Sequence, residues 1–291
     1  MEELIEESIE RLMEMEDEVA AAIAAILDRY FRTLQGRILT ELRIGQFQSE
    51  ATTIQDYQLL PLLPPDGSDE LLQIFEDLLQ RSTASGLALG EELAKPVVSS
   101  QVAATIPKQE IESEARKARR YLEQHSLAFS TAASVVVAQA MAEQTDLKEV
   151  KKQLKRQLDK VKSRMGAIVR TEAARASNNA ASSLYVQNNV KLVVIYATSG
   201  ERTCPYCIAT SGKVYKLGAI KVPRHIQCHC VIVPYSDNPF GVNPEVDKFR
   251  RRHRQEVLSY AKAKGIQPNE GPAFFELGTP LPVRLDAQRQ R

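Results

Sequence analysis

All four cysteines of this 291-residue chain lie between Cys204 and Cys230. Cys204 and Cys207 are separated by two residues, a spacing that lets one tight turn direct both thiolates at a single ion. After a further 17 residues come His225, Cys228 and Cys230. Zinc prefers four nitrogen or sulfur ligands in a tetrahedron, commonly two from each of two such segments. The spacing therefore predicts a zinc-binding knuckle.

The knuckle has more candidate ligands than a tetrahedral ion has positions. We expect Cys204, Cys207, His225 and Cys228 to bind the metal, and Cys230 competes for the last place because positions 228 and 230 share one side of a strand. His229 is a sixth candidate. Reduced buried cysteines, or disulfides formed outside the cell, are the alternatives. A single cluster in a large chain favours the metal, because disulfide frameworks spread through small secreted chains.

The residues around the cysteines indicate a structural zinc rather than a catalytic one. A catalytic zinc keeps an open position beside a general base. A zinc deaminase would carry a His-x-Glu motif ahead of its Cys-x-x-Cys, and none occurs upstream of Cys204. No nucleophile or acid–base set stands out either. We therefore predict no catalytic residues, no organic cofactor and no enzymatic activity.

The sequence around this knuckle predicts three short strands among long helices. β-Branched and aromatic residues predict strands at KLVVIYATS (191–199), Lys213–Leu217 and Cys230–Tyr235. Helical periodicity and capping signals predict helices over the first forty-odd residues, from Ser68 or Asp69 to Leu79 or Leu93, and over Lys108–Gln144, Asp146–Asn189 and Glu245–Lys264.

These elements predict an α+β protein with a predominantly helical N-terminal half, a small zinc-stapled core containing the strands, and an extended C-terminal tail. We divide the chain into a helical region (1–145), a core with the knuckle (146–236), and a C-terminal helix and tail (237–291). The segments around 45–69 and beyond 270 are rich in proline and glycine. We expect the first to be a surface loop and the second to order along another surface.

The first helix carries an apolar seam in which one position is polar. Glu16 fills that position, and the apolar members recur at alternating steps of four and three: Ile5, Ile9, Leu12, Val19, Ile23, Ile26 and Tyr30. We expect this seam to face the core of its own chain. An oligomerisation or docking helix is the alternative, since the same pattern forms the interface between the helices of a coiled coil.

Charge is balanced overall and concentrated locally. Lys and Arg number 38 against 37 Asp and Glu, a formal net charge of +1, which argues against a dedicated nucleic-acid coat. The cations nevertheless gather between 148 and 164, at Lys148, Lys151, Lys152, Lys155, Arg156, Lys160, Lys162 and Arg164. This helical face is either a solvated surface or one that contacts DNA or a protein partner.

No apolar stretch approaches the roughly 20 residues that span a bilayer. The acidic N-terminus lacks the positive start and apolar core of a secretory signal. We therefore expect no membrane partner and synthesis in the cytoplasm.

The ordered motifs of the central segment resemble those of the phage Mu F-like minor head proteins. They run from a helix to the knuckle: Arg170-Thr171-Glu172, the strand near Val193–Tyr196, Cys204 and Cys207, Gly212, Pro223, His225, Cys228 and Cys230. The resemblance covers roughly Lys151–Pro234. Two features depart from the common family pattern: the chain has no tryptophan, and it reads Cys-His-Cys where Cys-Arg-Cys is frequent.

The resemblance implies a structural virion protein of the head, near the portal, that assists head assembly and DNA packaging or delivery. Its partners would be the portal or major capsid protein, and its site of synthesis a bacterial cytoplasm. A zinc-stabilised nucleic-acid-binding module is the alternative. An ADP-ribosyltransferase-like toxin is a further one, because some relatives resemble those enzymes. Arg170 and Glu172 lie within a helical run, where we expect them to form local ion pairs and buttress the knuckle.

Overall fold

The structure is a computed structural model that describes residues 1–47, 65–98, 108–197, 203–237 and 243–269. The proline-rich segment at 48–64 and the tail from 270 lie outside the described residues, so the expectations for both stay predictions. The elements in chain order are α1 (Glu2–Phe47), α2 (Pro65–Ala94), α3 (Lys108–Ala142), α4 (Leu147–Gln187), β1 (Leu192–Tyr196), α5 (Pro205–Thr210), β2 (Val214–Lys216), β3 (Val231–Ser236) and α6 (Pro244–Lys264).

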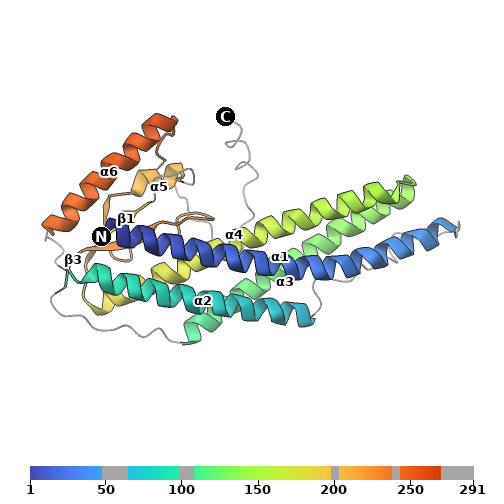
Figure 1. Cartoon of the computed structure of the whole chain (residues 1–291), viewed down its shortest axis with the longest axis horizontal. Coiled ribbons are helices and arrows are strands. Elements are labelled where there is room, and N and C mark those ends of the chain that lie inside the picture. The colour runs from blue at the N-terminus through green and yellow to red at the C-terminus, as the bar shows by residue number, and fades with distance from the viewer. Residues whose placement is uncertain (48–64, 99–107, 198–202, 238–242, 270–291) are drawn as a thin grey trace.

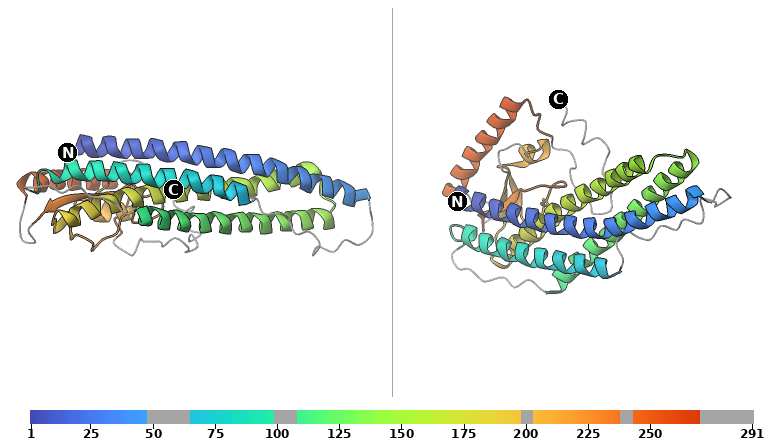
Figure 2. Two further views of the ribbon diagram at one scale, coloured as in Figure 1. Left: turned by 90° about the horizontal axis from the view of Figure 1, so that it is seen from below. Right: turned by 45° about the vertical axis from the view of Figure 1, so that its right-hand side comes forward.

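Four long helices form an elongated body, and the small sheet lies at one end of it (Figure 1). The second half of α1 runs out with α3 and the first half of α4 into an arm at the other end, as both views of Figure 2 also show. α2 packs against α1, α3 and α4. None of the described helices combines the length and apolar character needed to cross a membrane. The α+β prediction is confirmed.

The α1 seam faces the inside of its own chain. Its apolar members from Ile5 to Ile26 are buried, and Tyr30 is partly buried against the same core. From Leu12 onward these side chains share one core cluster with Leu71 and Phe75 of α2 and with Leu154 and Leu158 of α4. Ile5 and Ile9 pack instead in a cluster at the sheet. The core-facing interpretation therefore describes this seam. Oligomerisation through α1 stays a prediction and would have to use another face of the helix.

The closest approach in the body is the crossing of α2 and α4, and it depends on small side chains. A Cβ atom placed on Gly86 would lie 2.1 Å from the backbone oxygen of Ser177. One turn later, a Cβ on Gly90 would lie 3.2 Å from Cα of Ala181. The backbones of the two helices thus touch directly, and this contact places α4 beneath the sheet.

β1 is the central strand of a three-stranded antiparallel sheet with the order β2–β1–β3. Val194 pairs with Val214 on one side and with Val233 on the other. Because side chains alternate along a strand, the two faces differ. Val193 and Ile195 pack with α4 and the cysteines, whereas Tyr196 packs with the start of α1 and with Phe249 of α6.

The helix and strand predictions agree with the structure within a few residues, with one omission. α5 (Pro205–Thr210) was expected as a turn and is a six-residue helix. The proposed division at 145/146 falls in the turn between α3 and α4, and that at 236/237 falls at the end of β3. Since α4 shares one core with α1, α2 and α3, the two regions on either side of 145 are packed together. The division itself stays a prediction.

Candidate metal centre

The first two candidate ligands lie at the start of α5. Cys204 is the N-cap residue, and its Sγ accepts a hydrogen bond from the backbone N–H of Cys207 at 3.4 Å. Pro205 follows in the first turn, where its missing N–H costs no helical hydrogen bond. A sulfur thus takes the role of the usual capping oxygen, and the helical turn directs both thiols to the same side.

The other candidates come from the loop that leads into β3, and two α4 side chains hold this loop. Gln227 has a φ of 62°, a left-handed conformation uncommon for residues other than glycine. Its backbone N–H donates to Thr171 Oγ1 at 3.1 Å. Asn178 Nδ2 donates to the Cys230 carbonyl at 3.0 Å, and its Oδ1 accepts from Ile232 N at 3.0 Å. Cys228 and Cys230 therefore lie just before β3, in a loop rather than a strand.

The structure brings all five predicted ligand residues together. His225 Nε2 lies 2.8 Å from Cys204 Sγ and 3.0 Å from Cys207 Sγ. Cys207 Sγ lies 3.7 Å from the sulfur of Cys228 and 3.1 Å from that of Cys230. In a tetrahedral zinc site the ligand atoms are roughly 3.5 to 3.8 Å apart, since Zn–S is about 2.3 Å and Zn–N about 2.0 Å. Each of these four distances lies within an ångström of those values, and the two groups of ligands meet at Cys207, so the residues fit a zinc ion.

His225 is oriented as a zinc ligand requires. Its Nδ1 lies 2.7 Å from the Ile226 carbonyl oxygen, which accepts the ring N–H and leaves Nε2 facing the thiols. Cys207 belongs to both local groupings, one with Cys204 and His225 and one with Cys228 and Cys230. Cys207 is therefore central in every four-ligand set, and the choice between Cys228 and Cys230 stays open.

Hydrogen bonds within this cluster shift the pKa values of its thiols and of His225. The bond with the Cys207 thiol, helped by His225, lowers the pKa of Cys204 to about 5. The Cys207 thiol has its pKa raised, first by the bond with Cys204. Burial acts to lower the pKa of His225, but the bonds with Cys204 and Cys228 prevail and raise it to about 11. Without an ion, thiolates thus balance an imidazolium; a bound zinc would replace that proton.

His229 points away from the cysteines and joins the knuckle to α1. Its Nε2 lies 2.8 Å from Glu16 Oε2, and both side chains are almost fully buried. Glu16 is the polar residue of the α1 seam, so the position that interrupts the apolar pattern is the one that contacts the knuckle. Burial raises the pKa of Glu16. As the sixth candidate, His229 is thus engaged with a carboxylate rather than with the cluster.

α6 supports α5 from the opposite side. Arg254 donates to the Ser211 carbonyl at 2.9 Å and to the Ile208 carbonyl, at the C-terminal end of α5. His253 Nε2 lies 2.7 Å from Ser211 Oγ, and its ring stacks on Tyr196 with centroids 4.0 Å apart. α4 therefore holds the loop at residues 225–230, which we call the metal loop, and α6 holds α5.

Arg170 and Glu172 form ion pairs, as expected, with partners outside the metal loop. Arg170 pairs with Asp17 of α1 at 3.0 Å, and Glu172 with Arg175 at 2.8 Å. The residue that buttresses the loop is Thr171, which lies between them. Sequence reasoning also missed Asn178, although an amide on the apolar face of a helix is a recognisable signal.

Comparison with known proteins finds one family model that matches the central segment. Residues 133–233 match the family described as Phage Mu protein F like protein. This segment is 101 of the 291 residues, counting 133 to 233 inclusive, and it contains all five candidate ligands. No curated protein and no solved structure matches the chain. The resemblance indicated by the Cys/His pattern is thereby confirmed.

Proposed function

We propose that this chain, whose residues 133–233 belong to the phage Mu F-like family, is a minor head protein that acts near the portal. The family indicates phage head morphogenesis and association with the virion. The proposal adds that the protein binds the portal or the major capsid protein and assists DNA packaging or delivery. The knuckle would contribute structure, with zinc held by Cys204, Cys207, His225 and one or both of Cys228 and Cys230.

The observation that carries the proposal is that the family segment and the helical body are built as one unit. The metal loop bonds to α4 through Thr171 and Asn178, and to α1 through Glu16. A substrate-processing zinc would need an open coordination position, whereas here two groups of candidate ligands, Cys204 with His225 and Cys228 with Cys230, meet at Cys207 and offer more donors than a tetrahedral ion can take. This arrangement suits a brace that fixes a sheet onto long helices.

Metal analysis tests the knuckle. Purified protein should contain close to one zinc per chain, and Cys204→Ser or Cys228→Ser should lower this content because each removes a thiolate ligand. Arg224→Ala is the matched control in the same loop and should keep its zinc, because Arg224 is partly exposed and is not a candidate ligand. Protein that is metal-free, with its cysteines joined as disulfides, would contradict the metal assignment.

Particle composition tests the assembly role. Wild-type protein should co-purify with the portal protein and be present in purified heads. Cys204→Ser should be depleted from heads relative to Arg224→Ala. If wild-type chain were absent from particles, or present without association with portal or capsid protein, the proposed location would be wrong.

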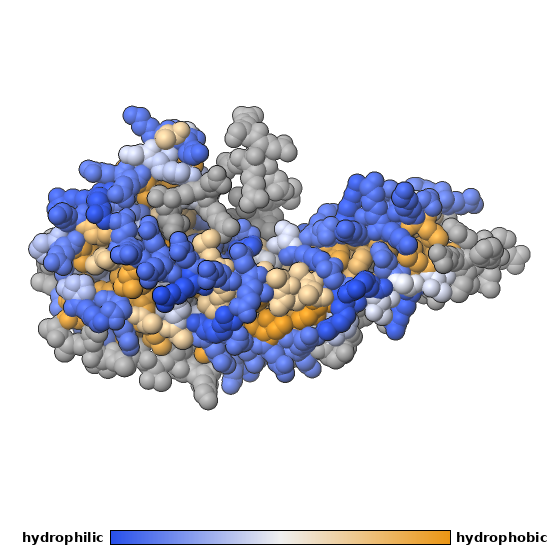
Figure 3. Space-filling view, in the orientation of Figure 1, coloured by the Kyte–Doolittle hydropathy of each residue, from blue (hydrophilic) through white to orange (hydrophobic). Residues whose placement is uncertain are grey.

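A DNA contact would use the basic part of α4. Lys148, Lys151, Lys155 and Arg156 are exposed in the arm, whose upper edge is a continuous hydrophilic surface in Figure 3. Lys162 is instead paired with Asp28 at 2.5 Å. The exposed cations therefore remain available for phosphates along one side of the helix.

Charge reversal tests this contact. Lys151→Glu with Lys155→Glu should weaken non-specific DNA binding and lower its salt dependence, because fewer counterions are released. Arg32→Glu with Arg37→Glu, which changes the same number of exposed charges on α1, should have a smaller effect. Equal binding by both variants would identify the α4 surface as merely solvated. DNA binding without incorporation into heads would favour the nucleic-acid-binding module.

A further inference from the structure

The helix α6 is strongly basic. Its 21 residues contain seven cations and three acids, a net charge of +4 by subtraction, in a chain whose total is +1. The helix lies outside the matched range 133–233. Some of this charge is structural, since Arg250 and Arg254 bond to the Gly212 and Ser211 carbonyls and hold α6 on α5. The remaining cations need a different explanation.

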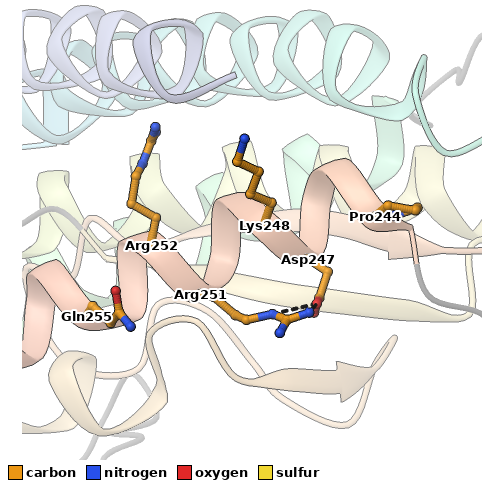
Figure 4. A pocket seen from close by; sticks show the side chains of 6 residues that line it. All are labelled: Pro244, Asp247, Lys248, Arg251, Arg252 and Gln255. Carbon is orange, nitrogen blue, oxygen red and sulfur yellow. Dashed lines mark hydrogen bonds and ion pairs between the residues drawn. The ribbon is translucent and has the colours of Figure 1, made fainter.

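Three of them line an open cavity of about 530 Å³ on the surface of α6. Its lining consists of Pro244, Asp247, Lys248, Arg251, Arg252 and Gln255. Lys248 and Arg252 project from successive turns, and Arg251 lies beside Asp247 (Figure 4). Counting three cations and one carboxylate, the lining has a net charge of +2.

The cations of this cavity differ in how they are held. Arg251 is oriented by Asp247, a buried carboxylate that also accepts from Tyr235 Oη at 3.0 Å and from Arg250 Nε at 2.6 Å. Arg252 contacts Glu2 of α1. Lys248 is exposed, and no described carboxylate pairs with it. Figure 4 shows Lys248 and Arg252 extending from one side of α6 and Arg251 from the other, so cationic groups of the kind that bind phosphate oxygens flank the cavity on both sides.

We propose that this α6 cavity binds the phosphate backbone of a nucleic-acid strand. The lining extends from Pro244 to Gln255, about 17 Å along the helix at 1.5 Å per residue. That length exceeds what one phosphate ion occupies and corresponds to about five nucleotides at 3.4 Å of rise per nucleotide. The side chains present no shaped set of base-edge contacts, so the contact is to the backbone and independent of sequence.

Titration of full-length protein with a short duplex DNA at several salt concentrations tests the proposal. Lys248→Gln with Arg251→Gln should weaken binding by about tenfold per lost contact at about 50 mM salt, and lower the salt slope by about 0.9 for each contact. Lys262→Gln with Lys264→Gln is the matched control. It removes the same charge from exposed positions of α6 outside the cavity and should leave binding close to that of the wild type.

Other results would overturn the proposal. They are an absence of DNA binding by the wild-type chain, no effect of the cavity variant, or an equal loss in the control variant. If the cavity variant abolishes binding of inorganic phosphate but not of DNA, the site takes free phosphate instead. Lys248→Glu alone should also weaken DNA binding. Because no described carboxylate pairs with Lys248, the melting temperature of this variant should be unchanged, which separates an effect on binding from an effect on folding. An absence of DNA binding by the wild-type chain would remove the α4 contact as well. A loss confined to the cavity variant is independent of the α4 contact and of incorporation into heads.

Discussion

Asn178 is a single α4 side chain on which the position of the metal loop depends. It bonds to the Cys230 carbonyl and to the Ile232 N–H at the start of β3. It also donates to the Ala174 carbonyl in its own helix at 2.8 Å. The amide thus hydrogen-bonds two backbone groups at the start of β3, one of which belongs to Cys230, the last candidate ligand.

Asn178→Ala should destabilise the folded protein by about 2 to 5 kcal/mol, because two buried backbone groups lose their partner at roughly 1–3 kcal/mol each. The neighbouring Asn179 is exposed, so Asn179→Ala should change the free energy of unfolding by less than about 0.5 kcal/mol. Urea unfolding of the two variants measures the difference. Similar values for both would show that the hydrogen bonds of Asn178 contribute little.

His253 predicts a loss of stability in mild acid. Burial lowers its pKa to about 4 from 6.5, against the opposing effect of the Ala197 backbone. Between these two values the unfolded chain binds a proton at His253 that the folded chain does not. The free energy of unfolding therefore falls as the pH drops from about 6.5 to about 4, by about 3 kcal/mol in total.

The comparison variant is His253→Phe, which keeps a ring against Tyr196 but cannot titrate. It should be less stable than the wild type at pH 7, because Ser211 Oγ keeps the Ala197 N–H but loses its bond with the imidazole. Its stability should depend less on pH below 6.5. Measuring both proteins across the range isolates His253, since they share the same metal cluster. Parallel pH curves would contradict the buried neutral imidazole.

The cysteines and histidine of the knuckle were predictable because ligand chemistry requires particular residue types at short spacing. Their supporting residues were not predictable in the same way. Thr171 and Asn178 act through single hydrogen bonds to backbone groups more than 50 positions away, and sequence spacing carries no information about such contacts. Glu16 was visible as an interruption of the α1 seam, but only the structure identifies His229 as its partner.

At the scale of elements, the α2–α4 crossing gives the sharpest prediction. Gly86→Ala should be strongly destabilising, since its Cβ would lie 2.1 Å from the Ser177 backbone oxygen and the helices would have to separate. Overpacking costs about 1–3 kcal/mol when side chains can move, and a backbone contact allows less relief. The same substitution at Gly36 of α1, where a Cβ meets nothing within 4 Å, should stabilise the chain by about 0.5–1 kcal/mol.

Thermal unfolding of Gly86→Ala and Gly36→Ala thus tests two effects of opposite sign with one chemical change. If Gly86→Ala left the melting temperature unchanged, the crossing would be looser than the structure shows.

Helices of this length were predictable because their apolar period repeats many times. α5 was missed because its six residues contain less than two turns, too few to display a period. Which helices cross closely was not predictable, since small residues at 86 and 177 mark a contact only once both are placed.

Across the whole molecule, α1 connects the two ends. Its first half packs on the sheet through Ile5 and Ile9, and Glu16 bonds to His229 of the metal loop. Its second half continues into the arm, where Ile38 and Leu42 belong to the core shared with α3 and α4. The order of the knuckle and the order of the first half of α1 are therefore coupled, whereas the arm belongs to a core cluster that contains no residue of the knuckle.

Metal removal should reveal this coupling in hydrogen exchange. Chelation should speed amide exchange in the metal loop and in the first half of α1, because loss of the ion frees His229 and with it the partner of Glu16. Exchange in the arm, over the second half of α1 and the first half of α4, should change little, since its apolar core contains no part of the knuckle.

Glu16→Gln should weaken the response in α1 without removing it, because Ile5 and Ile9 still pack on the sheet. Glu18→Gln, at an exposed neighbouring position, is the matched control and should respond as the wild type does. Faster exchange confined to 203–236 would show that the knuckle folds independently of α1, and faster exchange throughout the arm would show that all four helices depend on the metal.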